Sequence, residues 1–203
     1  QIDTINANTD FTFSCKRNNE IHIFRQEEWF KVFIHETFHS FCLDFSNIDN
    51  TQKLGNKIFP IKTDLYISES YCETWATIIH TIFVLYNQQY TKQPFTLDIY
   101  SKCNKLFESE IMFSLFQCCK IMKHYGIDYN MLCNNKNLDY SEKTPVISYY
   151  FFKSILLFNY DTFITWCQNN NNNNLFTFDN KNLHKYANLI FCLLYTSDAA
   201  DEI

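Results

Sequence analysis

The chain has 203 residues, of which 46% are hydrophobic and 19% are charged, with 21 Phe and 13 Tyr. This composition excludes an intrinsically disordered or collagen-like chain, and the length suits one domain. The formal net charge of -5 comes with 15 Lys and only 2 Arg, which do not cluster, so nucleic acid is not an expected partner.

The nine cysteines do not have the pattern of a disulfide framework. Their number is odd, none forms a Cys-x-x-Cys pair, and Cys118 and Cys119 are adjacent. We therefore expect reduced thiols and a cytoplasmic protein. The sequence has no signal-peptide pattern and no uninterrupted apolar run of about 18 residues, so a membrane is not an expected partner. The abundance of Phe, Tyr, Ile, Asn and Lys follows AT-rich codons, which are typical of giant-virus and protist genes, and for a viral protein the compartment would be the host cytoplasm.

The first predicted elements are a β-hairpin and a helix. Apolar and polar residues alternate in segments 11–15 and 21–24, which flank the polar stretch 16–20, as in a small antiparallel hairpin. Over residues 26–41, apolar residues recur at helical spacing and acidic residues occupy the first turn, which predicts a helix. The next segment, 43–64, mixes Asp, Asn, Gly and Pro, and we interpret it as a long surface loop.

Three further helices are expected after this loop. One runs from residue 65 or 68 to residue 86, and another covers about 96–125 and ends at Gly126 in the C′ position. Pro145 suits the first turn of a third helix, over 146–157, in which apolar residues recur periodically.

The C-terminal part of the chain has two unusual segments. The asparagine run 169–174 is of low complexity and cannot pack a core, so we expect a flexible surface insert. Residues 183–190 are helix-like, but residues 192–203 resemble the translation of a sequencing adaptor, and we expect them not to be native. The native part is then a single domain over residues 1–191 that is truncated in this chain.

Residues 35–39 read His-Glu-Thr-Phe-His, an HExxH sequence inside the first predicted helix. His35 and His39 then lie one turn apart on one face, where both imidazoles can bind one Zn²⁺, and Glu36 lies beside the open position of the metal. With only 6 His in the chain, a chance match is expected roughly once in a hundred such sequences. The alternative is two histidines at the surface or core edge of an amphipathic helix.

A catalytic zinc site needs a third protein ligand. The pattern HExxHxxGxxH is not present, because Cys42 and Phe45 occupy its Gly and third His positions. Residues 69–76 read Glu-Ser-Tyr-Cys-Glu-Thr-Trp-Ala, which opens the second predicted helix with two carboxylates four positions apart. This arrangement resembles the gluzincins, and the stretch is also similar to one in small peptidases that cleave transcriptional repressors. The gluzincin resemblance implies Glu69 as the third zinc ligand and Glu73 as the partner of a ligand histidine.

Other roles are open for some of these positions. Asp44 and Asp64 are alternative third ligands. Ser70 and Glu73 have the spacing of a capping box, which would make Glu73 structural. We expect no metal-binding role for the remaining candidates, which are Cys72, His22, His80 and His124.

Peptide hydrolysis also needs a hydrogen-bond donor to the developing oxyanion, commonly a Tyr or a His. Tyr149 and Tyr150 on the helix over 146–157 are the candidates, since adjacent tyrosines on a helix point to different faces and one of them can reach the cleft. The alternative is that both tyrosines only pack.

These observations predict a mostly helical, zincin-like α+β domain, in which a small N-terminal antiparallel hairpin precedes the HExxH helix and a second helix that carries Glu69. The resemblance implies a zinc metallopeptidase in which His35, His39 and Glu69 bind Zn²⁺ and Glu36 is the general base, acting on a peptide or protein substrate. The alternatives are a non-catalytic helical interaction protein and a zinc hydrolase of a non-peptide substrate.

Overall fold

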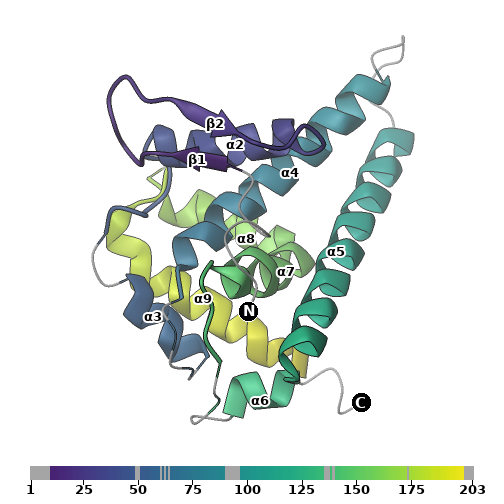
Figure 1. Ribbon diagram of the computed structural model, residues 1–203. Helices are drawn as coiled ribbons and strands as arrows, with labels where there is room; N and C mark the ends of the chain where they lie inside the picture. The colour runs from purple at the N-terminus through teal and green to yellow at the C-terminus, as the bar shows by residue number, and fades with distance from the viewer. Residues whose placement is uncertain are drawn as a thin grey trace.

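The computed structural model describes residues 10–48, 51–59, 61, 63, 65–89, 97–134, 138, 140–172 and 174–198. In that part of the chain the structure is mostly helical, with one small antiparallel sheet, which confirms the predicted α+β class at this level (Figure 1). None of the helices described there combines the length and the apolar character that a membrane span requires. The elements are β1 (Asp10–Thr12), β2 (Ile21–Ile23), α2 (Trp29–Ser40), α3 (Thr51–Ile58), α4 (Ile67–Gln89), α5 (Leu97–Tyr125), α6 (Tyr129–Asn134), η1 (Ile147–Phe152), α7 (Lys153–Phe158), α8 (Tyr160–Asn170), η2 (Asn180–Asn182) and α9 (Leu183–Asp198).

The N-terminal hairpin forms as predicted. β1 pairs with β2 in antiparallel register, with Phe11 opposite His22. In the connecting loop, the side-chain amide of Asn19 donates to Thr12 Oγ1 (2.8 Å) and to Ser40 Oγ at the end of α2 (3.2 Å). The bond to Ser40 attaches the hairpin to the C-terminal turn of α2, the helix that it lies against in Figure 1.

Helices α2, α4 and α5 confirm the predicted periodicities. The first of them begins at Trp29 rather than at Gln26, so the acidic residues 27–28 precede the helix. Helices α4 and α5 cover the predicted ranges and differ from them by a few terminal residues. Gly126 follows α5 with a φ angle of 65°, a left-handed conformation that a residue without Cβ adopts at little cost.

The expected surface loop over 43–64 is wrong. Its middle forms α3, and Leu54 and Ile58, one turn apart on that helix, are buried in the core. Gly55 lies so close to Leu65 that a Cβ at this position would clash with it, so the helix packs tightly on the chain that leads into α4. Most residues of the segment are polar, but it contains one pair of apolar residues at i and i+4. Burial of this pair is enough to hold a short helix against the core.

The helix expected over 146–157 forms, but it begins with the π-helical segment η1 and continues as α7. Glu142 Oε2 accepts hydrogen bonds from the first backbone N–H of η1 (3.1 Å) and from the hydroxyl of Tyr140 (2.8 Å). The carboxylate therefore caps the start of η1. Single π-helical turns inside helices frequently occur at functional sites.

Two described residues of the asparagine run 169–174 make hydrogen bonds, and one of them is buried, which its composition did not indicate. Asn171 is 1% exposed, and its side-chain amide donates to the hydroxyl of Tyr71 (2.9 Å). The side-chain amide of Asn172 donates to the carboxylate of Asp179 (2.6 Å). These side-chain amides donate hydrogen bonds to polar groups that are buried or lie in a loop. The composition of the segment does not indicate this role.

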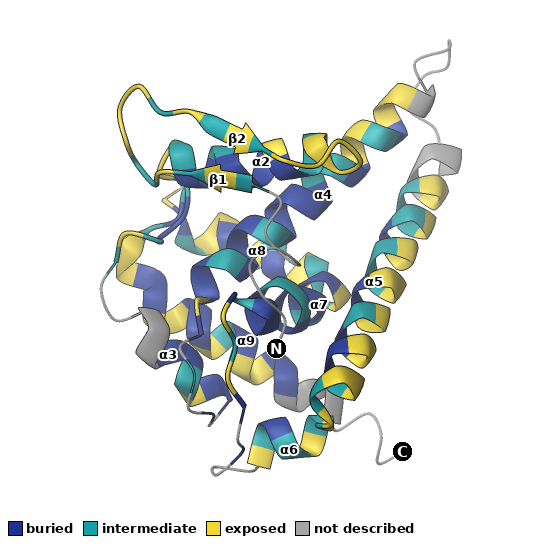
Figure 2. Cartoon of the chain, viewed as in Figure 1, coloured by how far each residue is buried: buried dark blue, intermediate teal, exposed yellow. Residues whose placement is uncertain are grey.

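The inward faces of α4, α7 and α9 meet in the core, as Figure 2 shows. Tyr71 of α4 is fully buried and lies edge-on to the rings of Phe45, Phe163, Phe178 and Tyr186. Such edge-to-face contacts add to the burial of apolar area and fix ring orientation. They hold the first turns of α4 in place, and these turns carry Glu69 and Glu73.

The C-terminal helix α9 continues from the helix-like segment through residue 198, and Leu193 and Leu194 are buried. Apolar side chains at these two positions are thus part of the core. That residues 192–203 are not native stays a prediction.

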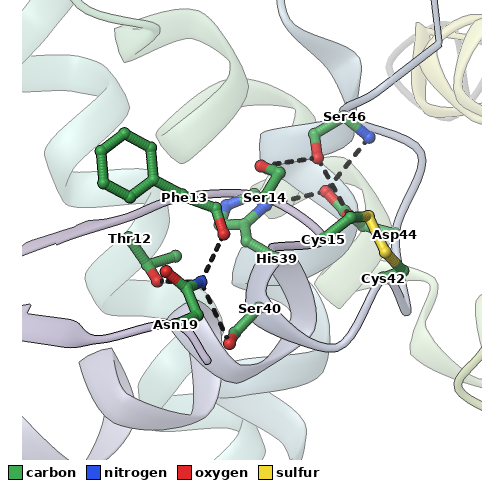
Figure 3. Close-up of a disulfide and its surroundings, with 10 residues drawn as sticks. All are labelled: Thr12, Phe13, Ser14, Cys15, Asn19, His39, Ser40, Cys42, Asp44 and Ser46. Carbon is green, nitrogen blue, oxygen red and sulfur yellow. Dashed lines mark hydrogen bonds and ion pairs between the residues drawn. A yellow bond between two sulfur atoms is a disulfide. The ribbon is translucent and has the colours of Figure 1, made fainter. Parts of the chain in front are cut away.

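The structure contradicts the expectation that all nine cysteines are reduced. Cys15 and Cys42 form a disulfide, with Cα atoms 4.9 Å apart (Figure 3). They meet because the end of the hairpin lies on the last turn of α2, where the backbone N–H of Cys15 donates to the carbonyl of His39 (2.9 Å). The other seven cysteines are not in disulfides.

Candidate metal centre

Helices α2 and α4 lie side by side and bring the three predicted ligands together. His35 and His39 are one turn apart on α2, and Glu69 lies in the first turn of α4. The two histidines are 3% and 7% exposed, so they are not surface residues of an amphipathic helix.

The ligand atoms have the spacing of a zinc site. His35 Nε2 lies 3.3 Å and His39 Nε2 lies 3.4 Å from Glu69 Oε2, and the two imidazole nitrogens are 3.1 Å apart. A tetrahedral Zn²⁺ with ligand bonds of about 2.1 Å holds its ligand atoms about 3.4 Å from one another. The three atoms therefore fit three corners of a zinc tetrahedron, and the fourth corner can take water or substrate.

The charges around these atoms favour a cation. Burial lowers the pKa of His35, but the neighbouring carboxylates of Glu69 and Glu73 outweigh burial and raise the pKa to about 10. Burial raises the pKa of Glu69, but His39 and His35 outweigh it and bring this pKa far below its usual value. The largely buried carboxylate of Glu69 therefore needs positive charge next to it. A bound divalent metal ion would supply that charge.

Glu73 lies next to Nδ1 of His35, the ring nitrogen that does not face the proposed metal position. Its Oε1 is 3.2 Å from His35 Nδ1, which is within ion-pair distance although the two atoms are not aligned as a hydrogen bond. Its Oε2 is 3.5 Å from the Nζ atoms of Lys31 and Lys153. Burial raises the pKa of Glu73, but the two lysines and His35 outweigh it and lower the pKa well below its usual value. Glu73 is therefore a charged residue that holds His35.

Asp44 holds the second histidine in the same way. Its Oδ2 lies 2.8 Å from His39 Nδ1, and its carboxylate also accepts hydrogen bonds from the backbone N–H and the hydroxyl of Ser46, both 3.2 Å (Figure 3). A carboxylate at Nδ1 directs the Nε2 lone pair toward the metal position. Of these two candidates for the third ligand, the structure thus places Glu69, and not Asp44, next to the two Nε2 atoms. The other alternative, Asp64, lies outside the described residues.

Neighbouring residues have packing roles. Ser70 lies inside α4, where its hydroxyl donates to a carbonyl one turn earlier (2.6 Å), so the capping box with Glu73 does not form. Cys72 is fully buried, with Sγ 3.8 Å from His39 Nδ1. Three histidines contact other groups, as His80 packs against Phe30, His22 lies near Glu20 and His124 lies near Tyr125.

Glu36 lies beside the ligand group. It is 4% exposed, and its Oε1 is 3.8 Å from His35 Nε2. Burial raises the pKa of Glu36 to about 7. A carboxyl group in this position is within reach of a water at the fourth corner of the tetrahedron.

A cavity of about 310 Å³ opens beside His35, and both predicted tyrosines line it. The ring of Tyr149 lies edge-on to the ring of His35, with centroids 6.3 Å apart. The ring of Tyr150 instead faces Lys153, whose Nζ is 5.5 Å from the ring centroid. Both tyrosines reach the cavity, and Tyr149 is the one that contacts a predicted metal ligand.

Two charged residues of this region were not predicted from the sequence. Lys31 and Lys153 both contact Glu73. Lys31 lies one turn before His35 on α2, so helical spacing was a signal for it. Lys153 is a single lysine in the apolar stretch 147–157, and a buried lysine needs a carboxylate, but only the fold identifies that carboxylate.

No protein-family model, no curated protein and no solved structure matches this chain. The geometry around His35, His39 and Glu69 is therefore what supports a function for the protein.

Proposed function

We propose that this protein is a zinc-dependent peptidase of the gluzincin type. The observation that carries the proposal is the convergence of His35 Nε2, His39 Nε2 and Glu69 Oε2, 3.1–3.4 Å from one another, on two packed helices. Two imidazoles and one carboxylate are a ligand set of catalytic zinc, which keeps its fourth position for water. The buried carboxyl group of Glu36 lies next to these atoms.

The residues next to the proposed metal position can each be given a role in peptide hydrolysis. Bound zinc would supply a Lewis acid that polarises the scissile carbonyl and lowers the pKa of a water. Glu36 takes a proton from that water and delivers it to the leaving amine. Tyr149, on the cavity wall beside His35, donates a hydrogen bond to the oxyanion that develops, and Tyr150 is the second candidate for this donor.

Two carboxylates keep the ligand histidines in place. Asp44 lies at Nδ1 of His39 and Glu73 lies at Nδ1 of His35. Such partners fix the tautomer and the ring orientation of a metal ligand and raise its basicity. A site that exchanges substrate and product needs this support, because the metal must stay bound when its fourth ligand leaves.

Zinc content and peptide hydrolysis, measured together on Glu36→Gln, test the proposal. Glutamine keeps the size of the side chain but cannot accept the proton, so we expect zinc as in the wild type and hydrolysis of a peptide library reduced by about 100-fold or more. Glu108→Gln, on the exposed part of α5, is the matched control and should keep both properties.

Two results would contradict the proposal in different ways. A wild-type protein that binds zinc but cleaves no peptide would favour a zinc hydrolase of another substrate. A wild-type protein that binds no zinc would favour a helical interaction protein.

A further inference from the structure

The cavity beside His35 is lined by more cationic than acidic side chains. Its charged walls come from the hairpin region, α2, α4, α5 and α7, which are distant in sequence but line one cavity. The cationic residues are Arg25, Lys31, Lys120 and Lys153, and the acidic residues are Asp10, Glu28 and Glu73.

Two of the lysines are largely shielded from solvent, and both contact the carboxylate of Glu73. Lys153 is 5% exposed and the side chain of Lys31 is 20% exposed. Both Nζ atoms lie 3.5 Å from the same oxygen of Glu73, whose other oxygen lies at His35. The second partner of Lys31 is Glu28, 3.8 Å away and itself 55% exposed. Beside His35, two ammonium groups thus lie against one carboxylate, that of Glu73.

The ammonium groups keep hydrogen-bond donors for a ligand. An ammonium group has three N–H donors. In the described part of the chain, Lys153 directs one donor to Glu73 and lies over the ring of Tyr150, which leaves a donor for the cavity that it lines.

The cavity reaches one of the three proposed metal ligands. His35 is both a metal ligand and part of the cavity wall, and Lys31 lies one turn before it on α2, about 6 Å along the helix axis. Consecutive Cα atoms of a peptide are about 3.8 Å apart. A side chain on the residue next to a peptide bond at the metal can therefore extend past His35 into the cavity, whose wall includes both lysines.

We propose that this cavity is a carboxylate-binding subsite, in which Lys31 and Lys153 bind a carboxylate from the residue adjacent to the scissile bond. The inference rests on the proposed peptidase function and adds its substrate class, namely peptides that carry an acidic side chain or a free C-terminal carboxylate at that residue. Charge-assisted hydrogen bonds in a partly buried cavity favour a carboxylate over its neutral amide. A basic side chain would meet like charge there.

Equilibrium binding of matched peptides to the Glu36→Gln variant tests the subsite without turnover. One pair of probes is Ac-Ala-Ala-Glu-Ala-NH₂ and its Gln counterpart, and the other is Ac-Ala-Ala-Ala with a free carboxylate and its C-terminal amide. We expect the acidic member of at least one pair to bind roughly tenfold tighter than its neutral partner, and that pair identifies the source of the carboxylate. The preference should weaken as salt is added.

Lysine variants made in the same background connect the preference to the cavity. Lys153→Met should remove the preference and Lys31→Met should reduce it, and the second variant keeps the test decisive if the first does not fold. Lys123→Met, on the exposed part of α5 and outside the cavity, is the matched control and should preserve the preference.

Three results would overturn the subsite and leave the peptidase proposal standing. They are equal affinity within both pairs, no measurable binding of any of the four peptides, and a preference that survives both Lys31→Met and Lys153→Met. A carboxylate preference in a protein whose wild type cleaves no peptide would instead contradict the peptidase proposal.

Discussion

Each proposed ligand histidine has one ring nitrogen at the proposed metal position and the other at a carboxylate. His35 faces Glu69 through Nε2 and Glu73 through Nδ1, while His39 faces Glu69 through Nε2 and Asp44 through Nδ1. Glu69 is therefore shared by both histidines, whereas Glu73 and Asp44 each support one. This division predicts different losses of zinc affinity when the carboxylates are replaced.

Glu69→Gln should weaken zinc binding far more than Glu73→Gln does. The first change removes a charged ligand, whereas loss of a partner behind a ligand histidine typically costs about 10- to 100-fold in metal affinity. Titration of both variants with zinc under one chelator measures the difference. If Glu73→Gln proves the more damaging of the two, their roles are reversed.

Asp44→Asn should lower zinc affinity by about 10- to 100-fold and leave the protein folded. The amide retains the size of the side chain but no longer offers a charged acceptor to His39 Nδ1. The same chelator titration measures the effect, and Asp161→Asn, on the exposed first turn of α8, is the control. Unchanged zinc affinity in Asp44→Asn would show that the carboxylate does not support the ligand.

At the scale of the elements, the helices that carry the site are those with regular apolar spacing. α2 and α4 could be predicted because their patterns are long and periodic. His35 and His39 are predicted as ligands from their local spacing, whereas Glu69 is predicted from the resemblance to gluzincins. α3 could not, since only Leu54 and Ile58 mark its inner face. The supporting contacts of Asp44 and Lys153 could not be predicted either, because their partners are brought to them by the fold.

The cap of η1 makes stability depend on pH. Burial raises the pKa of Glu142 to about 7, so the folded state binds this proton more tightly than the unfolded state does. The stability that the proton contributes is present at acidic pH and is lost as the pH rises from about 4 to about 7. Glu142→Gln cannot titrate, so the variant should gain up to about 3 kcal/mol relative to the wild type across this range.

Urea denaturation of Glu142→Gln and of the wild type, at intervals from pH 4.5 to pH 7.5, measures the gain. A difference in the free energy of unfolding that stays constant with pH would contradict the assignment of this titration to Glu142.

At the scale of the whole molecule, the hairpin is attached to the helical body at the end of α2, the helix that carries His35 and His39. The disulfide between Cys15 and Cys42, the backbone bond from Cys15 to His39 and the side chain of Asn19 all act there. The disulfide closes a loop between residues 27 positions apart, and such a crosslink reduces the conformational freedom of the unfolded chain.

The double variant Cys15→Ser, Cys42→Ser should be less stable than the wild type by roughly 3 kcal/mol, the loss expected for a loop of this length. Chemical denaturation measures it, and a reducing agent should destabilise the wild type but not the variant. Cys119→Ser replaces an exposed free cysteine and should leave stability unchanged. A wild type as stable with the reducing agent as without it would contradict a stabilising disulfide.

The central claim is that His35, His39 and Glu69 bind one zinc ion, and zinc content by elemental analysis tests it most directly. Wild-type protein, His35→Ala and the exposed control His184→Ala are purified in parallel and measured per chain. We predict one zinc in the wild type and in the control, and less than about a tenth of that in His35→Ala, because the remaining ligands cannot complete the site. Equal zinc content in all three proteins, or none in the wild type, would contradict the claim.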